Sequence, residues 1–144
     1  MKKYMLILRG LPGCGKTTYA KKLVKYWERL TKTRAAVCSA DDFFLQFGIY
    51  DFNPKLLQNA HSACKQSAKL FMANEEFGLV IIDNTNSQSW EYEPYLKMAQ
   101  ESGCIAKTKI IGKIDTISAR AYATRGLHSV STTTYDRMIT RWEK

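Results

Sequence analysis

The stretch "RGLPGCGKTT", residues 9–18, decides the fold of this chain. Its Gly10, Gly15, Lys16 and Thr17 fit the pattern G-x-x-x-x-G-K-[ST], the P-loop that cradles the phosphates of a nucleoside triphosphate. Glycines in such a loop let backbone N–H groups converge on phosphate oxygens, an approach that side chains would obstruct. The pattern therefore predicts a bound triphosphate, but it does not identify the group that receives the phosphate.

The residues around the loop supply the context that a P-loop requires. The apolar run "YMLILRG" (4–10) predicts a buried strand, and helical spacing predicts a helix from about Lys16 to Thr31. The positive end of that helix points at the phosphates. We assign Lys16 to the β- and γ-phosphates and Thr17 to Mg²⁺. The loop residues predicted to bind ATP are Gly13, Cys14, Gly15, Lys16, Thr17 and Thr18.

Strand and helix patterns alternate along the rest of the chain. The predicted strands cover 34–39, 77–83 and 104–111, and the predicted helices cover 53–74, 88–101, 116–124 and 134–142. We place "FGLVIID" (77–83), the most apolar strand, at the sheet centre, and "CIAKTKII" (104–111), which alternates, at an edge. The alternation predicts a single domain, residues 1–144, with the three-layer α/β fold of kinase-type P-loop NTPases. We expect a mainly parallel sheet of about four to five strands and a helical lid.

Helical spacing also predicts which side chains of the first two helices are buried. In the first helix the predicted buried face carries Tyr19, Leu23, Trp27 and Leu30, and Lys21, Lys25 and Arg29 line the opposite, solvated side. In the second helix, which Asn53 is expected to cap, the buried positions are Leu57, Ala60, Cys64, Ala68 and Phe71.

Composition limits the class of protein. The 144 residues suit one domain, and the net charge of +9 is typical either of a protein that binds nucleic acid or of a basic protein without such a partner. None of the four cysteines belongs to a C-x-x-C pair, so we expect free thiols and no zinc site. No signal peptide or membrane span is evident, so we expect a cytoplasmic protein with no membrane partner.

Acidic residues follow two of the predicted strands. Asp83 closes "LVIID", the Walker-B position, and we favour a role in holding Mg²⁺ over a role as a turn cap. In "SADDFF" (39–44), Asp41 or Asp42 could take the proton of an acceptor hydroxyl, and either could instead cap the next helix. Both assignments remain open on residue types alone.

Two arginines follow the last predicted strand. Arg120 and Arg125, in "ARAYATRGLH" (119–128), could close over the triphosphate as a lid and stabilise charge in the transition state, or could be solvated surface residues. The chain has no N-K-x-D guanine signature of a GTPase, and its length argues against a mechanical ATPase of the AAA type. These features favour a small kinase.

The motifs together resemble the polynucleotide 5′-kinase branch of P-loop kinases, which includes the kinase domain of phage polynucleotide kinase and small single-domain relatives. The segments that carry the resemblance are "RGLPGCGKTT", "SADDFF", "YDFNPKLLQNAHSAC", "IIDNTN" and "ATRGLHSV…DRMITRWE". They come in the order of the family and span nearly the whole chain. The P-loop alone is shared with many families, whereas this combination is much more specific.

The resemblance implies a role for each matching residue. Asp41 stands at the place of the family's general base, Lys16 and Thr17 match its phosphate- and Mg²⁺-binding pair, and Arg125 matches its lid arginine. The chain departs from the phage pattern at two places. The family's acid aligns with position 84, whereas the carboxylate of this chain is one residue earlier, at Asp83. Phe44 stands where the phage enzyme has an arginine that grips the phosphate of the acceptor. Phe43 and Phe44 could stack on a base, although we expect at least one of them to fill the core.

The expected function is an ATP- and Mg²⁺-dependent kinase that phosphorylates 5′-hydroxyl ends of DNA or RNA. The expected catalytic residues are Lys16, Asp41 and Arg125. Two alternatives remain open: a kinase of a small hydroxyl acceptor, such as a nucleoside or a sugar, and a nucleotide-binding module without catalysis. No mechanism is derived for His61, which we expect to be packed, or for His128.

Overall fold

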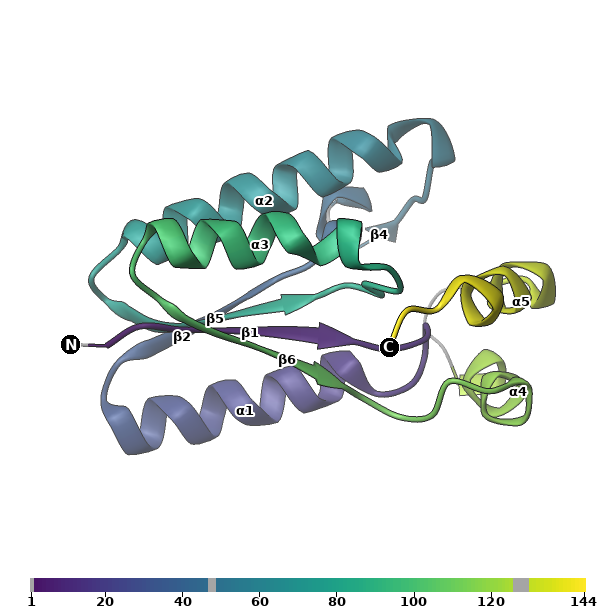
Figure 1. Cartoon of the computed structure of the whole chain (residues 1–144), viewed down its shortest axis with the longest axis horizontal. Coiled ribbons are helices and arrows are strands. Elements are labelled where there is room, and N and C mark those ends of the chain that lie inside the picture. The colour runs from purple at the N-terminus through teal and green to yellow at the C-terminus, as the bar shows by residue number, and fades with distance from the viewer. Residues whose placement is uncertain (1, 47–48, 126–129) are drawn as a thin grey trace.

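A computed structural model describes residues 2–46, 49–125 and 130–144. Its main sheet has four parallel strands in the order β2-β5-β1-β6 (Figure 1). These strands are β1 (Tyr4–Arg9), β2 (Arg34–Cys38), β5 (Phe77–Asp83) and β6 (Ile105–Ile110). Every residue of β5 is buried and β6 forms an edge, as predicted, and the parallel order brings all the carboxyl ends to one side.

Helices cover both faces of this sheet, which gives the predicted three-layer fold. One helix, α1 (Lys16–Thr31), lies on one face, and α2 (Leu57–Ala73) and α3 (Ser89–Glu101) lie on the other (Figure 1). The last two helices, α4 (Thr116–Arg125) and α5 (Thr132–Arg141), lie beyond the carboxyl ends of the strands, where a lid was expected. Within the described ranges, no helix is long and apolar enough to cross a membrane.

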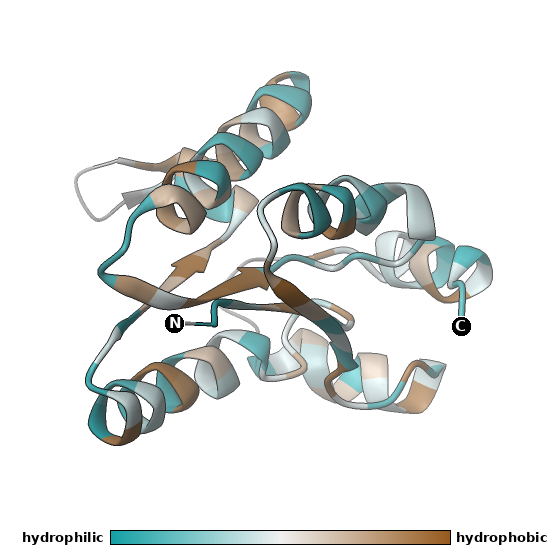
Figure 2. Ribbon diagram, turned by 60° about the vertical axis from the view of Figure 1, so that its left-hand side comes forward, coloured by the Kyte–Doolittle hydropathy of each residue, from teal (hydrophilic) through white to brown (hydrophobic). Residues whose placement is uncertain are grey.

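The apolar sheet forms the centre of the core, with polar residues on the outer faces of the helices (Figure 2). Ala60, Cys64 and Ala68 of α2 are buried against it, as their spacing predicted. Two predictions of burial were wrong: Leu30 is 60% exposed and Leu57 is 42% exposed. Both residues lie at helix ends, Leu30 in the last turn of α1 and Leu57 in the first turn of α2.

The segment between β2 and α2 contains structure that the sequence patterns did not predict. It folds into η1 (Ala40–Phe44), the antiparallel pair β3 (Leu45–Gln46) and β4 (Ile49–Tyr50), and η2 (Pro54–Leu56). The predicted cap is present, because the Asn53 side chain accepts a hydrogen bond from the backbone N–H of Lys55 at 3.0 Å. This segment carries "SADDFF" to the carboxyl edge of the sheet.

Candidate active site

Two glycines of the P-loop adopt backbone conformations that other residues rarely adopt. Gly13 has φ +77° and Gly15 has φ +107°, and Gly15 forms the N-cap of α1. A Cβ atom at Gly13 would lie 2.6 Å from the carbonyl oxygen of Tyr122, so only glycine lets α4 approach the loop this closely. The loop is therefore shaped both by its own turn and by the helix packed over it.

Lys16 lies inside the loop. Its Nζ donates hydrogen bonds to the carbonyl oxygens of Gly10 (2.8 Å) and Leu11 (3.1 Å) and lies 3.8 Å from Cys14 Sγ. The side chain is only 8% exposed, and the Cys14 thiol is buried beside it. A positive charge is thus fixed at the centre of the predicted phosphate cradle, and it has carbonyl partners that a phosphate oxygen would replace.

Thr17 and Asp83 form the predicted metal-binding pair. Thr17 Oγ1 donates to Asp83 Oδ2 at 2.8 Å, which joins the start of α1 to the end of β5. Burial raises the pKa of the Asp83 carboxyl, the hydrogen bond from Thr17 and the charge of Lys16 lower it, and the charge of Asp41 raises it further. A carboxylate that is destabilised by burial gains from a cation, and hard oxygen ligands suit Mg²⁺.

The ligand set fits a metal that is shared with phosphates. Among the described residues, no three His, Cys, Asp or Glu side chains lie together as a metal site made of protein alone would require. Mg²⁺ is typically held by one or two carboxylates together with substrate phosphates and water. Thr17 and Asp83 therefore fit the ion as partners of a bound triphosphate.

The two acids of "SADDFF" have different surroundings. Ser39 is the N-cap of η1, and its Oγ accepts from the backbone N–H of Asp41 at 3.2 Å. Burial and the charges of Asp41 and Asp83 raise the pKa of the Asp42 carboxyl, and a hydrogen bond from the Ser39 backbone lowers it. The backbone N–H of Asp42 donates to the Ser39 carbonyl oxygen at 3.2 Å, so both acids lie in the first turn of η1, whose side-chain cap is Ser39.

The Asp41 carboxylate faces a tyrosine. Tyr50 on β4 donates from its hydroxyl to Asp41 Oδ1 at 3.2 Å. Burial raises the pKa of Tyr50 to about 12, and the charge of Asp41 and this hydrogen bond add to the rise, so Tyr50 remains a donor at neutral pH. Cys38 of β2 pairs with Ile82 of β5, and the backbone N–H of Ala40 donates to Asn84 Oδ1 at 2.8 Å, so the tips of β2 and β5 lie side by side.

The two predicted lid arginines lie at different places. Arg125 Nε donates to the carbonyl oxygen of Gly13 at 3.1 Å, and its guanidinium lies 5.0 Å from the Tyr122 ring centre. Arg120 instead lines a hollow between α4 and α5, together with Asp136. The structure brings only Arg125 to the P-loop, and the role predicted for Arg120 stays a prediction.

Of the two histidines, only His61 lies among the described residues. His61 on α2 is half-buried, and burial lowers its pKa. The charge of Lys65 lowers this pKa further, whereas the charges of Glu91 and Asp41 raise it. This agrees with the expectation of a packed residue. His128, and the glycine that follows Arg125, lie outside the described residues.

Sequence reasoning missed several residues that support the site. Asn84 Oδ1 accepts from the backbone N–H of Ala40 at 2.8 Å and its Nδ2 lies 3.6 Å from Cys64 Sγ, so it ties β5 to η1. Asn84 is thus engaged in structure, whereas its neighbour Asp83 faces Thr17. Tyr135 of α5 donates to the carbonyl oxygen of Pro12 at 2.8 Å and holds the loop from outside. Such contacts join residues that are far apart in the sequence, so no local sequence pattern predicts them.

Arg9 is the most unusual of these residues. It is 3% exposed and lies between the rings of Tyr92 (4.6 Å) and Trp142 (4.8 Å). It donates to the backbone carbonyls of Asn86 (2.8 Å), Ser87 (3.3 Å) and Glu143. These contacts attach the chain after α5 to the end of β1, directly before the P-loop.

Solved structures of other proteins share this fold. The Chaetomium thermophilum Kti12 structure in complex with ADP-AlF3 has a TM-score of 0.73 at 19% identity and is matched over 97% of this chain and 80% of that chain. A chain of the Pnkp1/Rnl/Hen1 RNA repair complex has a TM-score of 0.70 at 19% identity, over 97% of this chain and 44% of that chain. A gluconokinase from Sinorhizobium meliloti 1021 has a TM-score of 0.60 at 11% identity, over 97% and 75%. The fold is that of P-loop kinase-like proteins.

Comparison of sequences relates the chain to a human protein and to one family. The chain is 32% identical to human NEDD4-binding protein 2, over 97% of this chain but only 8% of that protein's length. Residues 5–143 match the family model AAA_33, described as an AAA domain. From the chain length we expected no mechanical ATPase of the AAA type, and the family is nevertheless described as an AAA domain. The fold that it shares with the solved structures is also found in kinases. The chain therefore belongs to the AAA_33 family of AAA domains.

Proposed function

We propose that the protein is a polynucleotide 5′-hydroxyl kinase that transfers the γ-phosphate of ATP to the 5′ end of a nucleic acid. The observation that carries the proposal is the placement of Asp41, directly after β2, beside the end of β5, where Asp83 accepts the hydrogen bond from Thr17. A mere nucleotide-binding module has no use for an additional acid there. A kinase needs one, on the acceptor's side of the γ-phosphate.

The donor half of the reaction is assigned to the P-loop and its neighbours. Loop N–H groups and Lys16 bind the β- and γ-phosphates, and Arg125 offsets charge on the transferred group. Thr17 and Asp83 would hold Mg²⁺, which would neutralise part of the charge on the phosphates. The hydrogen bond of Arg125 to Gly13 keeps its guanidinium at the mouth of the loop, ready for this role.

The acceptor half is assigned to Asp41. Its carboxylate orients the acceptor hydroxyl and accepts the proton as the new O–P bond forms and the bond to the β-phosphate oxygen breaks. The Tyr50 hydroxyl holds one carboxylate oxygen, Oδ1. Asp42 is not expected to take this proton, because the resemblance to polynucleotide kinases places the base at the first acid of the pair.

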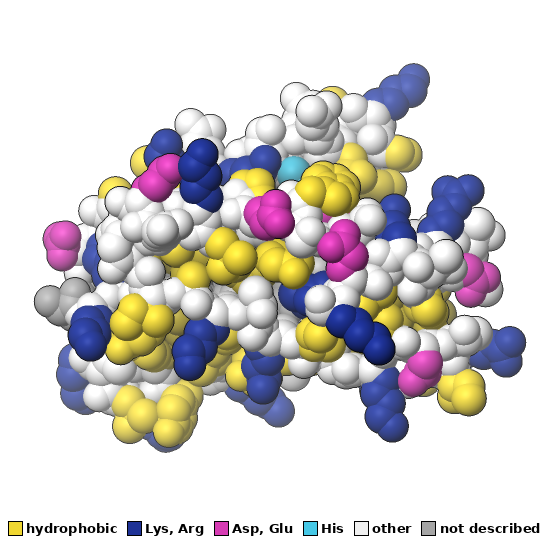
Figure 3. All heavy atoms as spheres, viewed as in Figure 1, with side chains coloured by type: hydrophobic (Ala, Val, Ile, Leu, Met, Phe, Trp, Pro, Cys, Tyr) yellow, Lys and Arg dark blue, Asp and Glu magenta, His cyan; other side chains and the backbone are white. Residues whose placement is uncertain are grey.

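A nucleic acid acceptor is supported by charge and by similarity. The net charge is +9, and Lys and Arg side chains are spread over the face in Figure 3 rather than gathered in one patch. A diffuse positive surface attracts a polyanion without fixing its sequence. The resemblance of the motifs to polynucleotide kinases and the shared fold with a chain of an RNA repair complex point the same way.

The test is phosphoryl transfer from γ-labelled ATP with Mg²⁺ to one of three acceptors: a 5′-hydroxyl oligonucleotide, a nucleoside or gluconate. We expect transfer to the oligonucleotide, at an affinity that falls steeply with salt because counterions are released. Preferred transfer to the nucleoside or to gluconate would establish the small-acceptor alternative. Nucleotide binding without any transfer would establish the non-catalytic one.

Asp41→Asn and Asp42→Asn form the matched pair for the mechanism. Asn keeps the size of Asp but cannot take a proton, so Asp41→Asn should lower single-turnover transfer by about 10²–10⁴-fold with little change in ATP affinity. Asp42→Asn should keep most of the rate. An Asp41→Asn rate within a few-fold of the parent would contradict the assignment of the base.

A further inference from the structure

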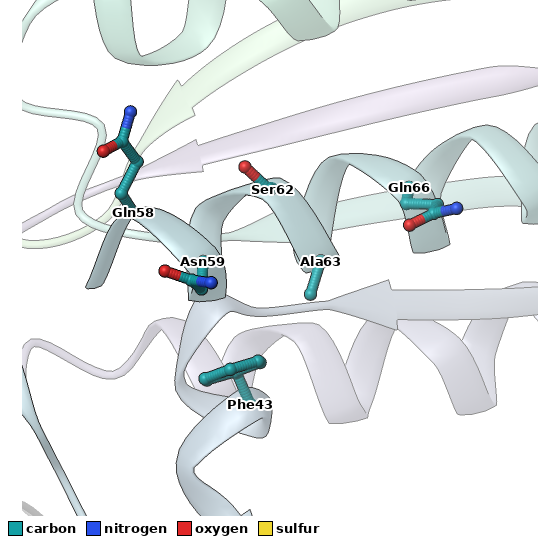
Figure 4. A pocket seen from close by; sticks show the side chains of 6 residues that line it. All are labelled: Phe43, Gln58, Asn59, Ser62, Ala63 and Gln66. Atoms are coloured by element: carbon teal, nitrogen blue, oxygen red, sulfur yellow. The ribbon is translucent and has the colours of Figure 1, made fainter. Parts of the chain in front are cut away.

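A hollow lies on the acceptor side of the molecule, between η1 and α2 (Figure 4). Its volume of about 440 Å³ lies within the range of small-molecule sites. Its lining consists of one aromatic ring from η1 and short or amide-bearing side chains from α2: Phe43, Gln58, Asn59, Ser62, Ala63 and Gln66. In Figure 4 the Phe43 side chain points toward the helix, opposite Asn59 and Ala63.

The Phe43 ring is held by a buried neighbour. Phe44 is 3% exposed and makes edge-on contacts with Phe43 (5.4 Å between ring centres), Phe52 (5.0 Å) and Tyr50 (6.3 Å). Phe43 itself remains 38% exposed. Of the two phenylalanines, Phe44 is thus the core residue, and Phe43 presents an ordered ring to the hollow, at low entropic cost for a ligand that stacks on it.

The polar lining is uncharged, in a chain whose net charge is +9. Amide side chains both donate and accept, and so do the edges of nucleobases, which is why Asn and Gln pair with base edges. A phosphate or a carboxylate would instead require Lys, Arg or clustered N–H groups. Together with an exposed aromatic ring, these groups match a flat, neutral heteroaromatic ligand.

The hollow is connected to the proposed general base in two ways. Phe43 follows Asp41 by two residues within η1, and Tyr50 bonds to Asp41 while its ring contacts Phe44. In a nucleotide, one sugar joins the 5′-oxygen to the base. A 5′-hydroxyl at Asp41 therefore places the base of the same nucleotide near Phe43.

We propose that this hollow binds the nucleobase of the acceptor's 5′-terminal nucleotide, with Phe43 stacking on the base and the amides of α2 meeting its edge. The proposal rests on the proposed function and specifies which kind of 5′ end the protein would phosphorylate. The terminal base must leave its stack to enter the hollow, so single-stranded and overhanging 5′ ends are favoured over blunt duplex ends. Because every base has a π-face, the preference among bases is weak.

The first test measures binding without ATP. A short 5′-hydroxyl oligonucleotide carries 2-aminopurine, whose fluorescence is quenched by stacking, either at its first position or in its interior. We expect added quenching only at the first position, lost in Phe43→Ala and retained in Phe52→Ala. Phe52 also packs on Phe44 but does not line the hollow, so it controls for a structural effect. Unchanged quenching in Phe43→Ala, or none in the parent, overturns the proposal.

The second test measures transfer to an oligonucleotide whose first nucleotide lacks a base. In the parent we expect KM to rise about 10-fold with little change in kcat, since stacking contributes to binding. In Phe43→Ala the base should no longer matter, and Ala63→Trp, which fills the hollow, should behave likewise. Equal KM values for both acceptors in the parent would refute this proposal while leaving the 5′-kinase assignment intact. An oligonucleotide that neither binds nor accepts phosphate would refute both.

Discussion

The donor side and the acceptor side of this site are built in different ways. On the donor side, Lys16 and Asp83 are buried and bonded to groups of the P-loop and α1. On the acceptor side, Asp41 and Phe43 are exposed on a short 3₁₀ helix, held by Tyr50 and Phe44. In the reaction that we propose, the donor side binds the same triphosphate in every turnover, whereas the acceptor side determines which molecule is phosphorylated.

The largest effect is expected from removing the charge at the centre of the donor side. Lys16→Ala should lower turnover by roughly 10³-fold and weaken ATP binding as well, because the ammonium contacts phosphates in both the ground and transition states. The measurements are single-turnover transfer and ATP titration. Lys21→Ala on the solvated face of α1 is the control and should leave both unchanged. Normal ATP affinity in Lys16→Ala would contradict the P-loop assignment.

The next prediction separates the two lid arginines. Arg125→Ala should lower turnover by about 10²-fold, because Arg125 lies at Gly13 of the loop. Arg120→Ala should change turnover only a few-fold, because Arg120 lines the hollow between α4 and α5. Steady-state kinetics on the two variants decides the matter. A larger loss of turnover in Arg120→Ala than in Arg125→Ala would show that the lid rearranges when nucleotide binds.

A smaller effect concerns stability behind the donor side. Arg9→Leu removes the donor of three backbone carbonyls and the cation between Tyr92 and Trp142, so the free energy of unfolding should fall by about 2–3 kcal/mol. Denaturant unfolding gives this number. Arg34→Leu is the control, since Arg34 also stacks on an aromatic ring, Phe77, but is exposed. A loss no larger than the control's would mean that the C-terminal attachment contributes little.

The smallest effect concerns the pH dependence of folding. Burial raises the pKa of Asp83, so the folded state binds its proton more tightly than the unfolded state does. Stability therefore falls as pH rises from the ordinary aspartate range through the raised pKa. Asp83→Asn should abolish this fall and raise the Tm of the ligand-free protein at neutral pH by roughly 3 °C, while transfer is lost. Thermal unfolding of both proteins across this range shows whether the carboxylate is destabilising.

The amino-acid sequence alone was enough to predict the α/β class, the strands, the bounds of α1 and the donor motif. These are local properties: apolar runs predict strands, and G-x-x-x-x-G-K-[ST] encodes a loop whose glycines, Lys16 and Thr17 act within one strand–loop–helix unit. Asp83 could be predicted for the same reason, since it ends an apolar strand. Leu30 and Leu57 were predicted wrongly because periodicity describes which side of a helix an apolar residue occupies, but not whether another part of the chain covers it at the helix end.

The arrangement of the acceptor side could not be predicted from sequence patterns and became clear only from the folded chain. Asp41 and Asp42 are adjacent and chemically equal, and they become different through a cap at Ser39 and a hydroxyl from Tyr50, nine positions along the chain. The same holds for Phe43 and Phe44, one facing a hollow and one buried, and for the stacking of Arg9 on Trp142, far away in sequence. Such differences arise from contacts between distant segments, and the free energy of those contacts depends on packing that no local pattern records.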